Sequence, residues 1–237
     1  MLKDFFIYMG MKKSLFLCIP SVQAMMPHIL SGNQLKYQQL IKECNIIICN
    51  GDAGTGKTMI ACNEGIRLLK ENKINKIVIT RPTSTVDGED LGFLPGNLEE
   101  KMHPFMLPIY DYFLEHYTKD GIKTLLNNDK LEIAPLCFMR GRTFKNSFVI
   151  CDESQNMSET QMKMFLTRIG EKSKMIVIGD VKQSDIGLDN GLNHLISSLK
   201  YKYQEPYKMF KDGFGLVSLD SSCIQRHPMI QKIIELY

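Results

Sequence analysis

The stretch IIICNGDAGTGKT, from Ile46 to Thr58, constrains the fold more than any other part of the sequence. An apolar run typical of a buried strand leads into a loop with three glycines. Beyond the loop, apolar residues recur at the spacing of a helix face: Met59, Cys62, Ile66 and Leu69. A strand, a tight loop and a helix in this order begin a crossover unit, which indicates an α/β fold with a parallel sheet.

The same alternation of short β-branched runs and helical patterns continues along the chain. Four of the six candidate strands are almost entirely apolar, as expected for strands buried on both faces of a sheet. Helices are expected after the capping box at Ser158–Gln161, at Leu98–Tyr117, and at the end of the chain from Pro228. The expected strands are Asn45–Cys49, Lys76–Thr80, Leu131–Phe138, Ser147–Asp152, Met175–Gly179 and Gly215–Leu219.

The composition indicates an ordinary globular domain and argues against several other classes. We expect 237 residues to form a single domain over residues 33–237, preceded by an N-terminal extension over residues 1–32. The net charge of +3 is too small to indicate a nucleic-acid partner by itself, and no run is long enough to cross a membrane. Seven cysteines without a Cys-x-x-Cys pair favour a reducing, cytoplasmic location over a zinc site.

The beginning of the chain leaves one alternative open. Two lysines precede the short apolar run Ser14–Pro20, an arrangement that also occurs in signal peptides. The run is at the short end for such a segment, and other residues precede the lysines, so a packed strand or extension is favoured.

The glycine loop matches the phosphate-binding pattern G-x-x-x-x-G-K-[ST] at every position. In such a loop, backbone N–H groups surround the β-phosphate, and the following helix adds its positive end. Lys57 is expected to reach the β- and γ-phosphates, and the Thr58 hydroxyl to bind Mg²⁺. A chance match is disfavoured, because a strand precedes the motif and an amphipathic helix follows it. The predicted nucleotide-binding residues are Gly51, Asp52, Ala53, Gly54, Thr55, Gly56, Lys57 and Thr58.

Two later strand ends supply the polar residues that such a site needs. In SFVICDESQN, Asp152 is expected to hold Mg²⁺ and Glu153 to polarise the attacking water, although an Asp-Glu pair is also common on surfaces. After MIVIGD, Asp180 and Gln183 are expected nearby, with Gln183 positioning water or sensing the γ-phosphate; an exposed polar turn is the alternative. Parallel strands present their carboxyl ends at one edge, so the three motifs should form one site. Glu153 favours hydrolysis over transfer to a small substrate.

Five segments taken in order resemble the PhoH family of P-loop ATPases, which is related to the first RecA-like lobe of superfamily 1 helicases. They are GDAGTGKT, VITRPTSTVDGEDLGFLPGNLEEKM, RGRTFKNSFVICDESQN, VIGDVKQSD and IQRHPMIQKI. The resemblance implies a RecA-like P-loop NTPase fold, a mainly parallel sheet flanked by helices, and Mg²⁺-dependent ATP hydrolysis. It suggests handling of single-stranded RNA or DNA, in a family linked to phosphate starvation and common in phages. Ser154 replaces a usual alanine, a small change expected to leave hydrolysis intact.

The resemblance also implies roles for residues outside these three motifs. Gln34 lies where related helicases place a glutamine that reads adenine. Arg81 and Thr83 follow the second strand, at the position of a segment that contacts single-stranded nucleic acid. Arg226, in QRHP, is a candidate γ-phosphate contact. The alternatives are a polar helix residue for Gln34 and a structural cap for Arg226.

A final expectation concerns assembly. Two-lobed helicases complete the ATP site with arginines from a second RecA-like lobe, and this sequence is too short for two lobes. An arginine supplied in trans raises the rate by roughly 10³–10⁵ in other hydrolases. Either Arg226 acts within the chain, or a neighbouring subunit donates Arg140, Arg142 or Arg226; solvated turn charges are the alternative for Arg140 and Arg142. We therefore expect a homo-oligomer, a hexamer as in relatives. The alternative function is a nucleotide-gated scaffold whose slow ATPase is not coupled to nucleic acid.

Overall fold

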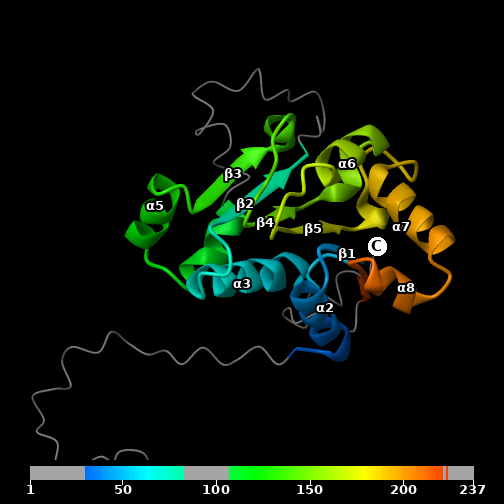
Figure 1. The fold of residues 1–237 in the computed structure, drawn as a ribbon, viewed down its shortest axis with the longest axis horizontal. Helices are drawn as coiled ribbons and strands as arrows, with labels where there is room; N and C mark the ends of the chain where they lie inside the picture. The colour runs from blue at the N-terminus through cyan, green and yellow to red at the C-terminus, as the bar shows by residue number, and fades with distance from the viewer. Residues whose placement is uncertain (1–29, 83–106, 221–222, 224–237) are drawn as a thin grey trace, which may run out of the picture. The chain divides into compact units, whose positions relative to one another are not determined.

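A parallel sheet of six strands organises the chain in the computed structural model, which describes residues 30–82, 107–220 and 223. Across the sheet the strand order is β3-β2-β4-β5-β1-β6 (Figure 1). Strand β1 lies between β5 and β6, and β5 alone separates it from β4. The strands are β1 (Ile46–Gly51), β2 (Lys76–Arg81), β3 (Leu131–Pro135), β4 (Ser147–Cys151), β5 (Lys174–Gly179) and β6 (Phe214–Leu219).

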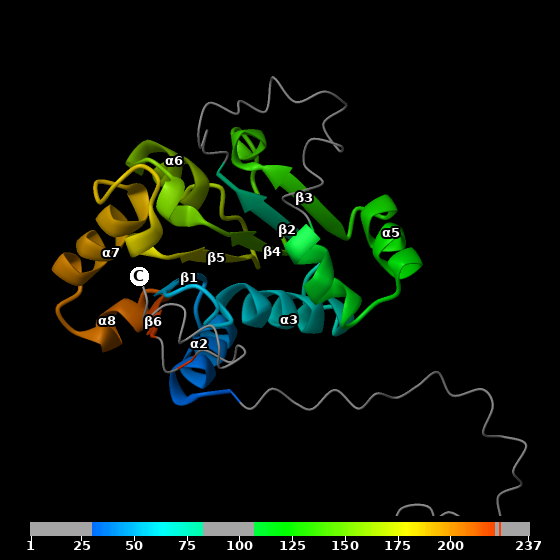
Figure 2. The ribbon, with the colours of Figure 1, turned by 180° about the vertical axis from the view of Figure 1, so that it is seen from behind.

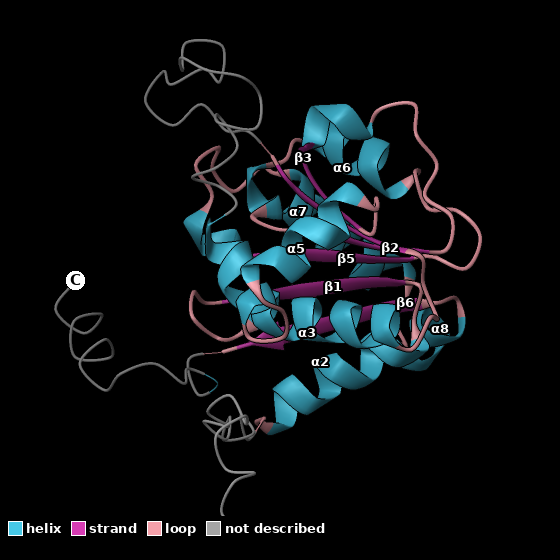
Figure 3. Cartoon of the chain, turned by 90° about the vertical axis from the view of Figure 1, so that its left-hand side faces the viewer, coloured by secondary structure: helices cyan, strands magenta, loops and turns pink. Residues whose placement is uncertain are grey.

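Helices cover both faces of the sheet, as Figure 3 shows edge-on. Helices α2 (Gly32–Glu43) and α3 (Lys57–Lys70) lie on one face, and α6 (Glu159–Leu166) and α7 (Gly191–Lys202) lie on the other. Seen from behind in Figure 2, α5 (Lys119–Asn127) lies at the β3 side of the sheet. The short α8 (Pro206–Lys211) packs beside β6. The expected α/β class, a parallel sheet flanked by helices, is confirmed.

The central strands are buried on both faces. Every residue of β4 is buried, and only the first residue of β5 is partly exposed. Each buried aliphatic or Phe side chain stabilises the fold by about 1.5–3 kcal/mol relative to its exposed state. This two-sided burial explains why the strands are continuous apolar runs rather than alternating ones.

The expected strand Leu131–Phe138 is wrong in its second half. Strand β3 ends at Pro135, and Leu136–Met139 form a 3-10 helix. Pro135 has no N–H to donate to the sheet, and it takes the last register position, opposite Arg81. The other five expected strands are confirmed within one or two residues at their ends.

The helix predictions are confirmed where the structure describes them, except at residues 115–117, which form a turn. Ser158 and Gln161 form the expected capping box at the start of α6, and residues 107–114 are helical within the expected Leu98–Tyr117. The last expected helix, from Pro228, lies outside the described residues, as does almost all of the expected N-terminal extension. The domain boundary therefore stays a prediction. No helix in the described part of the chain is long and apolar enough to span a bilayer.

Candidate active site

The glycine loop joins the carboxyl end of β1 to the first turn of α3. Gly54 and Gly56 have φ values of +79° and +82°, a region that glycine enters at no steric cost. Gly56 is the N-cap of α3, and no side chain caps the N–H groups of the first turn. An uncapped helix start facing a glycine loop is a ready site for a phosphate group.

Lys57 and Thr55 hold the loop closed on itself. The Lys57 ammonium donates to the carbonyl oxygens of Gly51 and Asp52 at 2.6 and 2.8 Å. The Thr55 hydroxyl, in a fully buried residue, donates to the Asp52 carbonyl at 2.8 Å. Phosphate oxygens are stronger acceptors for an ammonium than backbone carbonyls are, so a bound nucleotide can take over Lys57.

Asp152 follows β4 directly and contacts both neighbouring walls. Its Oδ1 accepts a hydrogen bond from the Thr58 hydroxyl at 3.0 Å. Its Oδ2 accepts two from Arg81, from Nη2 at 2.6 Å and from Nε at 3.2 Å. Asp152 is only 3% exposed, and a carboxylate buried to this degree is stable only when it is paired. Asp152 therefore connects β2, β4 and the glycine loop.

Thr58 and Asp152 are a suitable pair of ligands for Mg²⁺. Mg²⁺ prefers oxygen donors and in phosphate sites takes few protein ligands, with the remainder from phosphates and water. A hydroxyl and a carboxylate oxygen 3.0 Å apart meet this need. In the described part of the chain there is no group of three or more His, Cys, Asp or Glu that could hold a metal alone.

Glu153 has an unusual backbone conformation. Its φ is +55°, in the left-handed region that residues with a side chain adopt at a cost of roughly 1–3 kcal/mol. The side chain is exposed and lines the cavity described below. Its Oε2 accepts a hydrogen bond from Gln155 Nε2 at 2.7 Å. Such strain concentrates at functional sites, in agreement with a catalytic role for this residue.

Gln155 joins the end of β4 to the end of β5, and sequence reasoning did not single it out. Its side chain is 2% exposed, and while Nε2 donates to Glu153, Oε1 accepts from the Asp180 N–H at 3.1 Å. The Ser184 hydroxyl donates to the Gln155 carbonyl at 2.9 Å. The amide thus fixes Glu153 relative to the segment that carries Gln183.

A salt bridge connects that segment to the glycine loop. Lys182 Nζ lies 2.9 Å from Asp52 Oδ1, and hydrogen bonding to Asp52 raises the pKa of Lys182. Lys182 and Gln183 both lie on the 3-10 helix Val181–Gln183 and are exposed. The Asp180 carboxylate, in a residue 5% exposed, accepts from the Lys182 N–H at 3.0 Å. Gln183 is exposed, as the alternative of a polar turn predicted. It also lines the cavity described below, as the site prediction requires.

A cavity of about 300 Å³ opens where the three motifs meet. Pro108 and Tyr112, from the helix at residues 107–114, also line it and were not predicted. The expected gathering of the motifs at one edge of the sheet is confirmed in position, while the roles of the residues stay predictions. The predicted residues that line the cavity are Ala53, Gly54, Gly56, Lys57, Thr58, Arg81, Asp152, Glu153, Asp180 and Gln183.

Gln34 and Arg81 lie close to the glycine loop, each with its polar atoms already engaged. Gln34 is 1% exposed; its Nε2 donates to the Thr55 carbonyl at 2.9 Å, and its Oε1 accepts from the Ser31 N–H at 2.8 Å. Gln34 therefore supports the glycine loop through the backbone of Thr55. Arg81 forms an ion pair with Asp152 and lines the cavity, and its expected contact with nucleic acid stays a prediction. Thr83 lies outside the described residues.

The two arginines of RGRTF have different surroundings, and neither lines the cavity. Arg142 makes two hydrogen bonds to Glu132, at 2.5 and 2.8 Å, and its guanidinium lies 4.8 Å from the Phe144 ring centroid. Arg140 is exposed. Arg226 lies outside the described residues. Of Arg140 and Arg142, only Arg142 forms an ion pair with Glu132, so Arg140 can reach a neighbouring molecule without breaking that contact.

Ser154, the departure from the usual alanine, is accommodated without strain on the site. Its hydroxyl donates to the Ile178 carbonyl at 2.7 Å, and the residue is fully buried. A buried hydroxyl with a hydrogen-bond partner costs little, and this one ties the end of β4 to β5.

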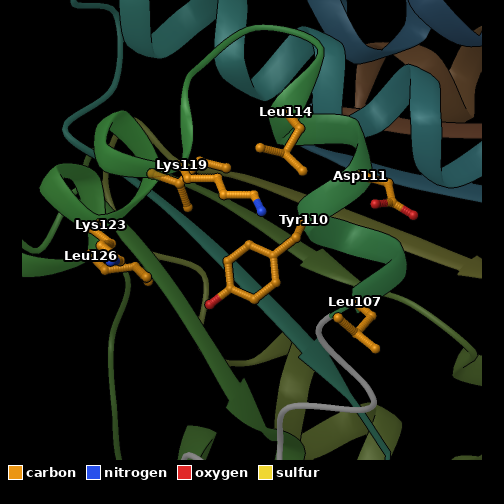
Figure 4. Close-up of a pocket in the computed structure, with 8 residues that line it drawn as sticks. Leu107, Tyr110, Asp111, Leu114, Lys119, Lys123 and Leu126 are labelled. Atoms are coloured by element: carbon orange, nitrogen blue, oxygen red, sulfur yellow. The ribbon is translucent and has the colours of Figure 1, made fainter.

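A second cavity, of about 470 Å³, lies between the helix at residues 107–114 and α5 (Figure 4). It is lined by the apolar residues Leu107, Leu114, Ile122 and Leu126 together with Tyr110, Asp111, Lys119 and Lys123. None of the residues from the three motifs lines it. Although larger than the motif cavity, it lacks convergent catalytic groups, and the chemistry belongs to the smaller one.

The fold and the site together define an α/β domain with a P-loop nucleotide site. The chain belongs to the PhoH family: the family model described as "PhoH-like protein" matches residues 28–237. It is similar to a PhoH-like protein of Bacillus subtilis, 42% identical over 206 residues, and to Protein PhoH of Escherichia coli, 43% identical over 215 residues. These alignments cover 86% and 88% of this chain.

The chain spans about three fifths of these relatives, 61% and 58% of their own lengths. The activity of the full-length relatives is therefore only proposed for this chain. Among solved structures, the large terminase of a thermophilic bacteriophage is 12% identical, with a TM-score of 0.48, covering 87% of this chain and 50% of that chain. A likeness this distant carries no argument about function.

Proposed function

We propose that this chain hydrolyses ATP with Mg²⁺ and couples turnover to the binding or remodelling of single-stranded RNA or DNA. One observation carries the proposal: a phosphate-binding lysine, a Mg²⁺-type oxygen pair and a strained glutamate line one cavity. They are Lys57, the pair Thr58 and Asp152, and Glu153. Membership of the PhoH family supports hydrolysis.

Phosphate binding falls to the glycine loop. The N–H groups of the loop and of the first turn of α3 surround the β-phosphate, and Lys57 exchanges its two carbonyl acceptors for phosphate oxygens. Thr58 and Asp152 would hold Mg²⁺, which neutralises phosphate charge when bound. Gln34 keeps the loop in shape through the Thr55 carbonyl rather than facing the cavity.

Water activation falls to Glu153 and Gln183. Glu153 accepts a proton from the attacking water as general base, and Gln155 restricts the direction of its carboxylate. Gln183, opposite on the next strand end, orients the water or contacts the γ-phosphate. An enzyme that transferred phosphate to a second substrate would not need a base that activates water.

The transition state needs one more positive charge than the described cavity supplies. Its lining contains two cationic side chains, Lys57 and Arg81, and Arg81 is bound to Asp152. We propose that a homo-oligomer, a hexamer by analogy with relatives, brings Arg140 of a neighbouring subunit to the site, while Arg142 stays with Glu132. Arg226 is the alternative donor. A monomer with full turnover at high dilution would contradict this arrangement.

The six described cysteines, all unpaired thiols, support a reducing cytoplasmic location as part of the proposal. Five of them are buried, where cysteine acts as a small apolar side chain.

Steady-state ATP hydrolysis with and without single-stranded RNA and DNA tests the coupling. We expect stimulation of several-fold by at least one polymer, and no turnover above background for Lys57→Ala or Glu153→Gln. If the chain is instead a nucleotide-gated scaffold, ATP hydrolysis should be slow and unchanged by either polymer. The size of the oligomer should then depend on bound nucleotide.

A further inference from the structure

Three aromatic side chains are exposed within ten residues where α7 leads into α8. Tyr201 is 89% exposed, Tyr207 71% and Phe210 38%. In the described part of the chain, Phe138 is the one other exposed aromatic of this kind. Single exposed apolar side chains are ordinary, but a group of rings at one place indicates a contact surface. We call residues 200–211 the α7–α8 corner.

The exposure of these rings follows from their positions on the helices. Tyr203, in the same segment, turns inward: its ring centroid lies 6.2 Å from that of Phe214, and its hydroxyl donates to Asp212 at 2.8 Å. On α8, Met209 packs against the core. Residues two positions from Met209 point to nearly the opposite side of the helix, so Tyr207 and Lys211 face away from the core.

The charge of the corner is positive and lies between the rings. Four exposed lysines belong to it, and its one carboxylate, Glu205, is already paired with Lys208 at 3.2 Å. Asp212, just beyond, accepts the Tyr203 hydroxyl. The remaining lysines, Lys200, Lys202 and Lys211, flank the exposed rings.

We propose that the α7–α8 corner binds single-stranded nucleic acid, with bases stacked on Tyr201 and Tyr207 and phosphates paired with the flanking lysines. Aromatic rings alternating with cations are the usual platform for single strands, because every base has a face to stack and every linkage a charge. A duplex fits less well, since its bases are already stacked. A two-fold contact with a second copy would bring like-charged lysines together.

The corner has a direct structural connection to the active site. Helix α7 begins beside the turn that carries Gln155, where the Gly191 N–H donates to the Met157 carbonyl at 2.7 Å. It then runs for 12 residues, about 18 Å at 1.5 Å per residue, and ends at Lys202 in the corner. A strand held at the corner therefore contacts the far end of a rigid helix whose near end packs against the catalytic turn.

This inference rests on the proposed function for its partner class, and a binding experiment separates the two. We would measure fluorescence anisotropy of labelled oligo-U, oligo-dT and a duplex with the full chain, without nucleotide. The double variant Tyr201→Ala/Tyr207→Ala should weaken single-strand binding by about 25-fold, taking about fivefold for each base that no longer stacks on a ring. Tyr201→Phe/Tyr207→Phe keeps both rings and should bind as the wild type does.

A second double variant tests the charge. Lys200→Ala/Lys202→Ala should reduce the slope of log K against log salt by about 1.4, because each lysine–phosphate pair that is removed lowers it by about 0.7. Tight binding of oligo-U, of oligo-dT or of both supports the proposal, and the ratio of the two Kd values identifies the preferred strand. Duplex binding as tight as single-strand binding contradicts it.

The remaining outcomes distinguish the corner from the proposed function. If Tyr201→Ala/Tyr207→Ala binds and is stimulated like the wild type, the corner does not hold the strand and the proposed function stands. If the corner binds single strands but ATP turnover ignores them, the corner stands and the coupling fails. If the alanine variant changes only the oligomer size in gel filtration, the corner is an interface between copies, which overturns the proposal.

Discussion

Two arginine–carboxylate pairs in this protein have similar chemistry and different surroundings. Arg81 and Asp152 meet at the cavity between three strand ends, and Arg142 and Glu132 meet at the β3 edge of the sheet. The side chain of Asp152 is 5% exposed and that of Glu132 is 23% exposed. Asp152 also accepts the Thr58 hydroxyl, whereas Lys76 provides the second contact of Glu132.

The difference shows that the groups around an ion pair determine whether it serves the active site or only the stability of the fold. The edge pair has a carboxylate shared by two cations and does not line the motif cavity, so we expect it to stabilise the fold. The site pair combines a nearly buried carboxylate with a hydroxyl, a cavity and an arginine. We refer to them as the site pair, Arg81–Asp152, and the edge pair, Arg142–Glu132.

The largest expected effect comes from the carboxylate of the site pair. Asp152→Asn should reduce ATP turnover by at least about 10²-fold, because a neutral amide no longer supports the metal or balances Arg81. Glu132→Gln is the matched change in the edge pair and should leave turnover at the wild-type level. Steady-state phosphate release at saturating Mg²⁺ and ATP measures both. Equal losses in the two variants would remove the distinction between the pairs.

Removing the arginine of the site pair should act on folding as well as on activity. Arg81→Ala leaves Asp152 buried with one partner fewer, which should cost about 1–3 kcal/mol of unfolding free energy. Mg²⁺ with a non-hydrolysable ATP analogue should restore part of that loss, since the metal replaces the missing charge. Urea unfolding with and without the ligand measures this. If the Arg81→Ala deficit is the same with and without ligand, Asp152 is not facing the metal position.

Glu153, the residue after the carboxylate of the site pair, is held by a hydrogen bond from Gln155. Gln155→Ala frees the Glu153 carboxylate and removes an acceptor from the buried Asp180 N–H, so turnover should fall by about tenfold with little change in nucleotide affinity. Ser184→Ala removes a hydrogen bond to the Gln155 backbone alone and serves as the control. A Gln155→Ala enzyme with unchanged kcat would show that the amide is a structural bridge only.

The smallest effect is expected in the edge pair. Arg142→Ala should cost about 1 kcal/mol of stability at neutral pH, as for a well-formed, partly exposed bidentate pair. Hydrogen bonds from Arg142, the largest cause, and from Lys76 lower the pKa of Glu132 from 4.5 to about 2, against the opposing effect of burial. A lowered carboxyl pKa stabilises the fold above 4.5, and that contribution disappears as pH falls toward 2.

The stability difference between wild type and Arg142→Ala should therefore be constant from pH 7 to pH 5 and shrink below it. Urea unfolding of both proteins from pH 7 to below pH 5 measures this difference in stability. Turnover of Arg142→Ala should equal that of the wild type, while Arg140→Ala should lower it if Arg140 is the arginine donated between subunits. A slow Arg142→Ala enzyme with unchanged stability would reverse the assignment.

The central strands and the glycine loop were predictable because burial on both faces leaves a continuous apolar run. The same reasoning failed at β3, where an apolar run continues past Pro135 but the sheet does not. Helices α5, α7 and α8 are absent from the sequence predictions. For α7 a signal exists in the N-cap Asn190 and the buried residues Leu192, Ile196 and Leu199 at helical spacing.

The polar network of the site was predictable only in part. Asp152, Glu153 and Gln183 follow strands, so the rule that ligands bind at the carboxyl ends of parallel strands locates them. The bridge from Gln155 to Asp180 and the salt bridge from Lys182 to Asp52 join segments 25 and 130 positions apart. Such contacts depend on β5 lying between β4 and β1, which local sequence patterns do not specify.

The most direct test of water activation by Glu153 compares nucleotide binding with hydrolysis in the single variant Glu153→Gln. Binding of a fluorescent ATP analogue with Mg²⁺ and phosphate release under single-turnover conditions are measured on the same preparation. Glu153→Gln should bind with a Kd close to that of the wild type and release no phosphate above background, because the glycine loop is intact and the base is missing. Wild-type phosphate release by Glu153→Gln would contradict the assignment of the cavity as the place where water is activated.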